Sequence, residues 1–216
     1  MYHGACPRPE DPPLVITCIE DLRQLHKRRV PRMFYDYAES GSWSEWTFRR
    51  NSEAFAERVL RQRVAVDIAE RDVSGEMLGQ RVTMPVGIAP TGLAGMQHAD
   101  GEILGAKAAE AFGVPFTLST MSICSIEDVA AQTSAPFWFQ LYVMKDRGFI
   151  ESLIDRAKRA GCSALVLTLD LQILGQRHKD LKNHMTAPPK LTIPNLINMA
   201  TKPRWCLGML GTRRLI

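Results

Sequence analysis

Apolar runs alternate with amphipathic segments from about residue 84 onward, and this pattern predicts a parallel sheet. Four runs suit buried strands: MPVGIAP (84–90), VPFTLST (114–120), PFWFQLYV (136–143) and SALVLTLD (163–170). Helical segments separate them over residues 100–112, after a capping-box pair at Ser125 and Asp128, and from Asp146 to Gly161. Strands that alternate with helices at this spacing form parallel βα units, because a parallel connection needs a crossover.

The N-terminal third of the chain has a helical pattern and no obvious strand run before about residue 64. Thr17 and Glu20 have capping-box spacing at the start of a first predicted helix. A second helix is predicted over 31–39 and a third over 52–60. At the other end of the chain, residues 178–216 contain four prolines and have weak periodicity, so we expect a long irregular excursion there.

The two-residue period of a strand predicts which side chains share a face. In the fourth run, Leu165, Leu167 and Leu169 form an apolar face, which we expect to lie under covering helices. The opposite face becomes polar at its C-terminal end, with Thr168 and Asp170. Both a β/α barrel and an open doubly wound sheet bind their ligands at that end of the strands.

Composition places the chain among ordinary soluble globular proteins. Of its 216 residues, 45% are hydrophobic and 23% are charged. No segment approaches the roughly 18 to 20 apolar residues of a spanning helix, and the first residues lack the apolar core of a signal peptide. The five cysteines are scattered without a CxxC pair, which argues against a zinc or other metal site and against a disulfide framework. We therefore expect a cytoplasmic protein, with membrane contact at most peripheral.

The net charge of +4 is distributed unevenly. Residues 177–216 carry eight Lys or Arg against the single acid Asp180, a net charge of +7, so the remainder of the chain is net −3. Because Trp205 and several aliphatic residues lie among these cations, an interaction or membrane-surface module is one hypothesis for this segment. Nucleic-acid binding is not expected, because the charge lies in one segment without a recognised binding motif.

The chemistry predicted from the chain is concentrated at the ends of the strands. The usual signatures GxGxxG, GxxxxGK[ST], GxSxG and HExxH are absent. Polar residues instead follow the apolar runs: Pro90-Thr91-Gly92, Ser119-Thr120, Gln140 with Tyr142, Thr168 with Asp170, and then Arg177. One such residue means little, because strands end at polar residues anyway, but the repeat favours a ligand site. Hydroxyls and an amide suit a neutral heterocycle, and the arginine and tyrosines suit a small carboxylate.

Several longer stretches of the chain resemble a known family. IAPTGLAGMQHADGE, TLSTMSICSIEDVA, FWFQLYVMKDR and LTLDLQILGQRHKDLKN are similar to motifs of the FMN-dependent 2-hydroxy-acid dehydrogenases and oxidases, as is PRMFYDYAESGSWSEWT near the N-terminus. The similarity runs from about residue 17 to about residue 210, and the motifs occur in family order. The resemblance implies a (β/α)8 TIM barrel with FMN across the strand C-termini, and oxidation of an L-2-hydroxy acid, L-lactate first among them.

The resemblance also implies roles for individual residues. Those that would contact the flavin are Pro90, Thr91 and Gly92 in the first βα loop and, on its ring, Ser119, Gln140 and Thr168. Tyr37 and Arg177 would bind the substrate carboxylate, and Tyr142 would lie near the hydroxyl. Asp170 would orient the catalytic histidine of the family. From periodicity alone, Tyr37 fits a core position equally well, and Asp170 fits a helix cap.

The chain also departs from the family pattern. Leu171-Gln172-Ile173 replaces an arginine and a Thr-Pro pair that many relatives have after the acid. Gly92 and Met121 stand where oxidases often have alanine or tryptophan, so the dehydrogenase members are the better match. Substrate size and the electron acceptor stay open at this point.

The largest departure concerns length. A barrel of this kind takes about 250 residues, whereas 136 residues remain from residue 81, enough for four βα units. We expect an N-terminal helical segment over 1–80, the first half of the barrel over 81–177 and a basic active-site loop over 178–216. The family's flavin-side lysine, catalytic histidine and phosphate loops have no counterpart here, so the chain alone is expected to be inactive. A full-length protein would be expected to form a homo-oligomer.

Overall fold

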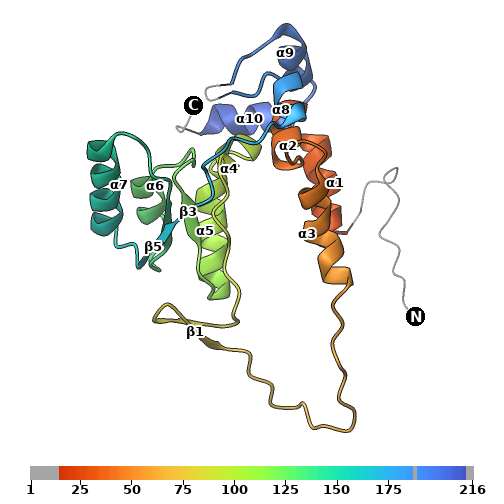
Figure 1. Cartoon of the computed structure of the whole chain (residues 1–216), viewed down its shortest axis with the longest axis vertical. Helices are drawn as coiled ribbons and strands as arrows, with labels where there is room; N and C mark the ends of the chain where they lie inside the picture. The colour runs from red at the N-terminus through yellow and green to blue at the C-terminus, as the bar shows by residue number, and fades with distance from the viewer. Residues whose placement is uncertain (1–14, 187–188, 213–216) are drawn as a thin grey trace. The chain divides into compact units, whose positions relative to one another are not determined.

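The computed structural model describes residues 15–186 and 189–212 (Figure 1). The chain divides into two compact units, and each is described by itself. Unit 1 comprises Met1–Arg49, Gln97–Ala99 and Gly175–Ile216, and unit 2 comprises Arg50–Met96 and Asp100–Leu174.

The centre of unit 2 is a parallel sheet of three strands. These are β3 (Thr117–Ser119), β4 (Trp138–Leu141) and β5 (Ala164–Leu167), in the order β3-β4-β5. Both strand pairs are parallel, which confirms the predicted βα repeat. The predicted first strand over 84–90 is reduced to one parallel bridge between Ile88 and Phe116, in which the Ile88 N–H donates to the Pro115 carbonyl at 2.8 Å.

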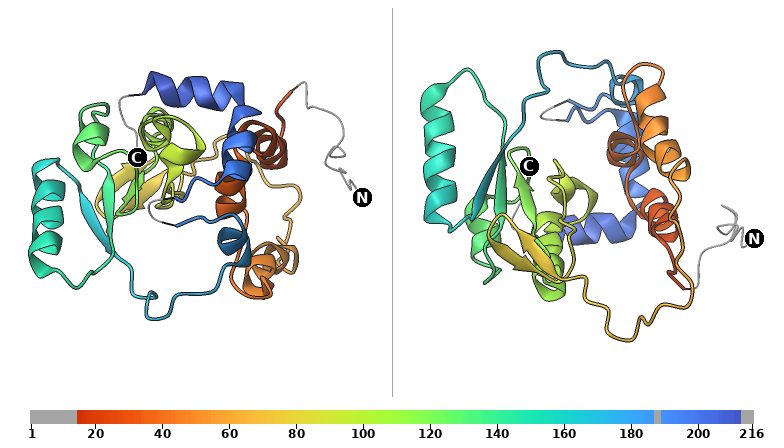
Figure 2. Two further views of the ribbon diagram at one scale, coloured as in Figure 1. Left: turned by 90° about the horizontal axis from the view of Figure 1, so that it is seen from above. Right: turned by 60° about the horizontal axis from the view of Figure 1, so that its bottom comes forward.

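Three helices cover one face of this sheet: α5 (Gly101–Phe112), α6 (Ile126–Ala130) and α7 (Arg147–Arg159). Both views in Figure 2 show α7 lying alongside the strands. The core between helices and sheet includes Leu118 and Phe139, which are almost completely buried. Phe137 and Leu141 belong to the same core, so the predicted division of β4 into two faces is confirmed.

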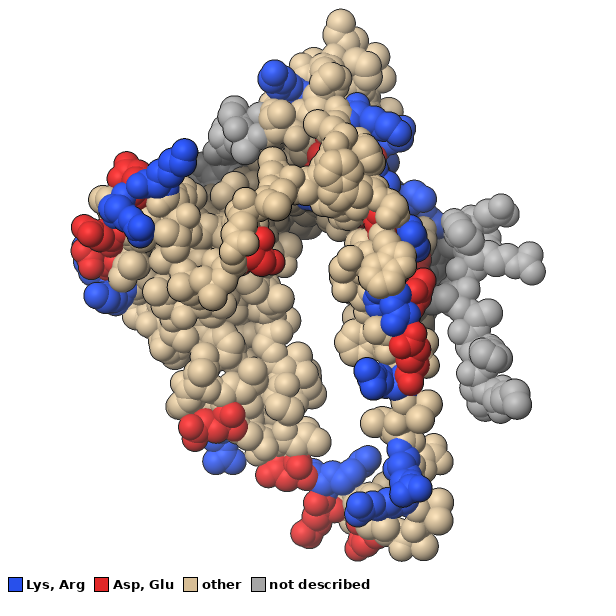
Figure 3. All heavy atoms as spheres, in the orientation of Figure 1, with Lys and Arg blue, Asp and Glu red and all other residues tan. Residues whose placement is uncertain are grey.

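Helix α7 is amphipathic in the way that its sequence predicts. Ile150, Leu153 and Ala157 are buried, at the three- and four-residue spacing of one helix face. Its charged residues, among them Asp155 and Arg159, are exposed, and Figure 3 shows charged side chains gathered in this region at the left of the view. Burial of one stripe and hydration of the other therefore fix the side of the helix that faces the sheet.

The predicted helix ends of unit 2 are confirmed in detail. The Ser125 hydroxyl accepts from the Asp128 N–H at 3.0 Å, and the Asp128 carboxylate accepts from the Ser125 N–H at 3.0 Å. Asp146 caps α7 by accepting from the Phe149 N–H at 3.0 Å. Gly113 follows α5 with φ 76°, a left-handed conformation that favours glycine at a helix end.

Two features of unit 2 differ from the sequence prediction. An antiparallel hairpin of β1 (Gly75–Met77) and β2 (Gln80–Val82) precedes the parallel strands and was not predicted. In β5, the predicted covering of the leucine face is wrong, because Leu165 and Leu167 are 49% and 50% exposed. The physical reason is that β5 is the outer strand of this sheet and the chain leaves it as a segment without helix or strand.

Unit 1 is helical. Its helices are α1 (Ile19–Arg29), α2 (Arg32–Ala38), α8 (His178–Lys182), α9 (Ile193–Ala200) and α10 (Pro203–Gly211). Two further helices, α3 (Trp46–Ala56) and α4 (Ala94–Gln97), cross the division between the units. The predicted second helix is confirmed within a residue at each end. The third begins and ends earlier than predicted, so that residues 57–60 lie outside it.

The expectation of an irregular segment over 178–216 is wrong for its described residues, which form three helices. Pro194 and Pro203 lie in the first turns of α9 and α10. A proline is compatible with that position, because the first N–H groups of a helix have no intrahelical partner. These prolines therefore begin helices that they were expected to prevent.

The cap of α1 is shifted by one residue from the prediction. Asp21, and not Glu20, supplies the carboxylate: its Oδ2 accepts from the Thr17 N–H and the Thr17 hydroxyl, both at 2.8 Å. The same oxygen accepts from the Cys18 N–H at 3.2 Å. These backbone and hydroxyl donors lower the pKa of Asp21.

In the described part of the chain, no helix has the length and apolarity needed to cross a membrane.

Candidate functional site

The carboxyl ends of β3, β4 and β5 bring three of the predicted flavin-contacting residues into one hydrogen-bonded row. Ser119 and Gln140 are register partners, and their hydroxyl and amide oxygen are 3.2 Å apart. The Gln140 amide nitrogen donates to the Thr168 hydroxyl at 2.8 Å. Ser119 is 3% exposed, Gln140 is 1% exposed and Thr168 is half-buried, so the row leads from the sheet interior toward its surface. We call these three residues the polar row.

Thr120 completes the row, although it was predicted only as a polar strand-end residue and not as a site residue. Its N–H donates to the Gln140 amide oxygen at 3.2 Å, and its hydroxyl donates to the Gln140 carbonyl at 2.6 Å. The same hydroxyl accepts from the Tyr142 N–H at 3.1 Å. Thr120 therefore fixes both the side chain of Gln140 and the start of the loop that carries Tyr142. The available signal was the Ser-Thr pair directly after an apolar run.

The first βα loop is joined to the loop that follows β3. The Leu93 N–H donates to the Met121 carbonyl at 2.9 Å, and the Met121 N–H donates to the Ser119 hydroxyl at 3.1 Å. Pro90 and Thr91 are exposed and Gly92 is half-buried. The structure thus connects the predicted loop residues to the polar row through backbone hydrogen bonds of their immediate neighbours.

The polar row has no ionisable side chain, and this character decides which ligand it suits. A carboxamide and hydroxyls offer both donors and acceptors without a charge to be neutralised. Such a set fits the C=O and N–H groups of a planar heterocycle such as the flavin ring. It does not fit a phosphate, which in proteins is bound by cations or by helix N-termini. The residues of the polar row therefore fit the ring of FMN.

The two residues that were predicted to be catalytic follow the ends of their strands. Tyr142 is half-buried directly after β4, with its N–H held by Thr120. Asp170 is exposed, three residues beyond the end of β5. Both lie in unit 2 with the polar row.

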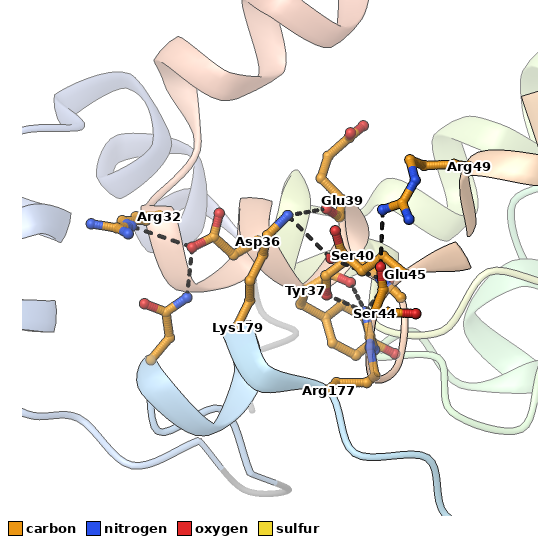
Figure 4. Close-up of polar contacts among 12 residues, drawn as sticks. Arg32, Asp36, Tyr37, Glu39, Ser40, Ser44, Glu45, Arg49, Arg177 and Lys179 are labelled. Carbon is orange, nitrogen blue, oxygen red and sulfur yellow. Dashed lines mark hydrogen bonds and ion pairs between the residues drawn. The ribbon is translucent and has the colours of Figure 1, made fainter. Parts of the chain in front are cut away.

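Tyr37 and Arg177 lie in unit 1, where the structure brings them together (Figure 4). The guanidinium carbon of Arg177 is 4.7 Å from the centroid of the Tyr37 ring, a cation–π arrangement. Its Nη2 also donates to the Tyr37 carbonyl and, at 3.0 and 2.9 Å, to the carbonyl and hydroxyl of Ser40. Tyr37 is half-buried, so it is not a fully enclosed core residue.

Asp180 completes the surroundings of Arg177. The Asp180 carboxylate lies 3.2 Å from Nη1 of Arg177. Burial raises the pKa of Asp180, and the positive charge of Arg177 opposes that rise. One face of the guanidinium is thus occupied by the aromatic ring, and its Nη atoms contact backbone, hydroxyl and carboxylate oxygens of unit 1.

Cys18, Cys124, Cys162 and Cys206 are free thiols. Within residues 15–186 and 189–212, no cluster of three or more His, Cys, Asp or Glu side chains could hold a metal ion.

Parallel βα units with a polar row at the strand C-termini define a class of protein that binds its ligand at the carboxyl edge of the sheet. Comparison with known proteins identifies the family: residues 26–215 match FMN-dependent dehydrogenase. The chain belongs to this family, whose cofactor is FMN.

Individual relatives support the same assignment. The chain is 43% identical over 200 residues to an L-lactate dehydrogenase of Ectopseudomonas mendocina (strain ymp), covering 92% of this chain and 52% of that protein. It is 45% identical over 192 residues to an L-lactate dehydrogenase of Haemophilus influenzae (strain PittEE), covering 89% and 50%. The chain therefore spans about half the length of the curated relatives that it matches.

Among solved structures, the crystal structure of the monotopic membrane protein (S)-mandelate dehydrogenase superposes with a TM-score of 0.84 at 36% identity. The superposition covers 90% of this chain and 52% of that one. A soluble mutant of the membrane-associated (S)-mandelate dehydrogenase from Pseudomonas putida gives a TM-score of 0.75 at 40% identity, covering 82% and 51%. These neighbours are TIM-barrel enzymes, and the βα units described above correspond to part of such a barrel.

Proposed function

We propose that this chain supplies the flavin-ring contacts and part of the substrate clamp for FMN-dependent oxidation of an L-2-hydroxy acid to the 2-keto acid. The observation that carries the proposal is the polar row, a buried, uncharged set of donors and acceptors at the strand C-termini. Membership of the FMN-dependent dehydrogenase family and the similarity to L-lactate dehydrogenases support it, and they favour L-lactate as the substrate.

In this proposal, bound FMN supplies the hydride acceptor of the reaction. Ser119, Gln140 and Thr168 orient the ring through neutral hydrogen bonds, and the backbone of residues 90–92 lies against it. The loop links described above limit the freedom of both loops, which favours a fixed ring position because little ordering is then lost on binding.

The remaining predicted residues act on the substrate in the same proposal. Arg177 binds the carboxylate through its guanidinium, and Tyr37 lies beside Arg177 as an aromatic support. The Tyr142 phenol hydrogen-bonds the substrate hydroxyl. Asp170 orients the histidine base that the family resemblance implies, and a carboxylate in that position favours the charged imidazole.

The 216-residue chain by itself is proposed to bind FMN weakly and not to turn over L-lactate. The polar row contacts only the ring, and the groups that fit it are not the groups that bind a phosphate. A fluorescence titration of FMN into the purified chain, followed by dye reduction with L-lactate, tests both parts. A flavin that stays bound through gel filtration together with lactate-dependent dye reduction would contradict this proposal.

A matched pair of variants tests the site itself. Thr168→Val removes the hydroxyl at the outer end of the polar row and is expected to weaken FMN binding by about tenfold, the effect of one lost hydrogen bond to a buried partner. Thr133→Val is the control, because its hydroxyl donates only to the Val129 carbonyl at the end of α6. Equal affinities of both variants for FMN would argue against the site.

Peripheral membrane contact is a second candidate function, favoured by a specific observation. Exposed aliphatic residues are carried by α9 and α10 and the residues before them: Leu191, Ile193, Leu196, Ile197, Leu207 and Leu210. They lie in the basic segment near Arg204, as expected for a helix pair on an anionic lipid surface. The similarity to a protein described as a monotopic membrane protein supports this candidate.

Sedimentation with anionic phosphatidylserine vesicles tests the membrane candidate. Binding is expected to fall as salt rises, because the basic residues are screened. Ile197→Glu is expected to reduce binding, whereas Leu104→Glu, which alters an exposed leucine of α5, is expected to have no effect. Binding that is insensitive to salt and to Ile197→Glu would exclude this surface.

A further inference from the structure

The buried carboxylate of Glu102 joins two loops at the carboxyl edge of the sheet. Glu102 lies in the first turn of α5 and is 2% exposed. Its Oε1 accepts from the Gly95 N–H at 2.9 Å and from the Ile123 N–H at 3.0 Å. Gly95 belongs to the connection that follows the first βα loop, and Ile123 belongs to the loop after β3. One oxygen atom therefore holds both loops.

The two loops also pack closely at this point. A Cβ atom at Gly95 would lie 2.6 Å from the Ile123 Cβ and 3.0 Å from Oε2 of Glu102, too close for any other residue without a shift. The hydrogen bond from the Leu93 N–H to the Met121 carbonyl adds a second link between the same loops. Contact and hydrogen bonds together make the two loops one structural piece.

The environment of Glu102 is unfavourable for a carboxylate that serves stability alone. Its Oε2 is buried and has no hydrogen-bond partner among the described residues. The neighbouring Cys124 thiol has a pKa raised to about 12, chiefly by burial and also by the Glu102 carboxylate. A buried, half-satisfied carboxylate costs free energy relative to an apolar residue of similar size. Its structural use is the pair of backbone contacts at Oε1.

Helix α5 contains a second glutamate with the same kind of contact at its other end. Glu110 Oε1 accepts from the Ser134 N–H and the Ala135 N–H, both at 2.8 Å. These donors precede β4, so Glu110 holds the loop at the amino end of that strand. The two contacts are alike in chemistry and differ only in the end of the sheet that they serve. Only the Glu102 contact joins the loops that carry residues 90–92 and 119–121.

We propose that Glu102 is a positioning residue for the flavin site, which fixes the first βα loop against the loop after β3. The proposal rests on the proposed function, because it assigns these loops to the flavin. Glu102 acts through the backbone of Gly95 and Ile123 and does not touch the ligand itself. Its contribution is to keep the loop residues Pro90, Thr91 and Gly92 in a fixed position relative to the polar row.

Amide hydrogen exchange in the 216-residue chain tests this inference without a ligand. Glu102→Ala is expected to raise exchange at residues 91–97 and 119–125 by about tenfold or more, because both N–H groups lose their acceptor. Glu102→Gln retains a carbonyl oxygen at the same position and is expected to remain near wild type. Glu110→Ala is the matched control and is expected to raise exchange only at residues 134–135.

A titration with FMN, read by flavin fluorescence, supplies the second measurement. Glu102→Ala is expected to weaken FMN binding by about tenfold, with rescue by Glu102→Gln and no change in Glu110→Ala. If Glu102→Ala does not fold, Gly95→Ala replaces it, because the added methyl group separates the loops while Glu102 is intact. That variant is expected to raise exchange at Ile123 and to weaken FMN binding.

Three results would overturn the inference. Exchange in Glu102→Ala that rises equally in the loops and in β4 would make Glu102 a general stabiliser. Loops that do not respond would exclude the contact, and loops that loosen without any change in FMN affinity would exclude the positioning role. A wild-type chain that binds no FMN, with loops that still respond to Glu102→Ala, would instead contradict the proposed function and leave the loop contact established.

Discussion

At the scale of single residues, Gln140 is the side chain on which the polar row depends. Its amide oxygen accepts from Ser119 and Thr120, and its nitrogen donates to Thr168. Gln140→Leu keeps the volume and leaves these groups without their partner. We expect a loss of about 1–3 kcal/mol in the free energy of unfolding, measured by urea denaturation. Gln132→Leu, an exposed glutamine on the same unit, is expected to change it by less than about 0.5 kcal/mol. Similar losses in both variants would contradict this account.

The cysteines provide a second prediction at this scale. Burial raises the pKa of Cys124 to about 12 and that of Cys162 to about 11, so both thiols are almost wholly protonated at pH 8. Since the thiolate is the reactive form, a thiol reagent at pH 8 is expected to label exposed Cys18 promptly and to label Cys124 and Cys162 only after unfolding. The measurement is mass spectrometry of labelled peptides in a Cys6→Ser background. Adding Cys18→Ser is expected to abolish the prompt label, and prompt labelling of Cys124 would refute the prediction.

Sequence reasoning found some of these residues and missed others for a physical reason. Gln140 and Thr168 could be predicted because a polar residue at the end of an apolar run is unusual enough to notice. Glu102 could not, because an acid in the first turn of a helix is ordinary, and only the tertiary fold shows that this one is buried. For the same reason Glu20 was preferred to Asp21 at α1, since spacing alone does not show which carboxylate reaches the loop.

At the scale of elements, an ion pair joins α6 to α7. Arg156 donates from Nε and Nη2 to the two oxygens of Glu127, at 2.8 and 2.7 Å, a bidentate arrangement. The hydrogen bonds from Arg156 lower the pKa of Glu127 to about 2, from an ordinary value of 4.5. A carboxyl with a lowered pKa stabilises the fold fully above its ordinary value, and this stabilisation is lost as the pH falls toward 2.

Glu127→Gln is therefore expected to destabilise the chain at pH 7 and to have a smaller effect at pH 3. The Glu127 side chain is 55% exposed, so the loss at pH 7 is expected to be under about 1 kcal/mol. Urea denaturation at both pH values measures it, and the double variant with Arg156→Gln isolates the pair. Glu151→Gln, an exposed acid of α7, is the control. An equal loss at pH 7 and pH 3 would show that the charge of Glu127 is not responsible.

Element boundaries were predictable where a side chain marks them and were missed where the backbone alone does. Ser125, Asp146 and Gly161 marked helix ends correctly. The β1–β2 hairpin turns at Leu78 and Gly79, with φ of 49° and 76°, so both central residues are left-handed. Such turns usually show as Asn-Gly or Asp-Gly, and a leucine in the first position conceals the turn from sequence reasoning.

At the scale of the whole molecule, the uncovered face of β5 predicts self-association. Leu165 and Leu167 are about half exposed on the outer strand of the parallel sheet, which also has free backbone groups at its edge. We expect the wild-type chain to associate as its concentration rises and Leu167→Lys to associate less, because a charge at an edge strand opposes pairing. Sedimentation velocity over a concentration series measures this. Leu104→Lys on α5 is the control, and a monomeric wild-type chain at the highest concentration would disprove the prediction.

The division of the chain into its two units could not be predicted from local patterns. Unit 1 joins segments from opposite ends of the sequence through contacts such as Arg32 N–H to the Asn198 side chain at 2.7 Å. The Lys202 ammonium likewise donates to the Arg28 carbonyl at 2.6 Å. Periodicity reports on neighbours within a helix or strand, so it predicted the parallel repeat of unit 2 and gave no indication that residues 175–212 pack with the N-terminal helices.

The hydrogen bonds of the polar row also have a direction. The Thr120 N–H can only donate, so the group that it meets on Gln140 is the oxygen, and the nitrogen must face Thr168. The Thr168 hydroxyl is therefore an acceptor toward Gln140 and retains its own proton for a partner beyond the strand. Successive bonds that point the same way polarise one another, which makes this last proton a better donor. The strand end thus presents a proton to its ligand, and it selects a carbonyl oxygen or an unprotonated ring nitrogen over an N–H group of the same shape.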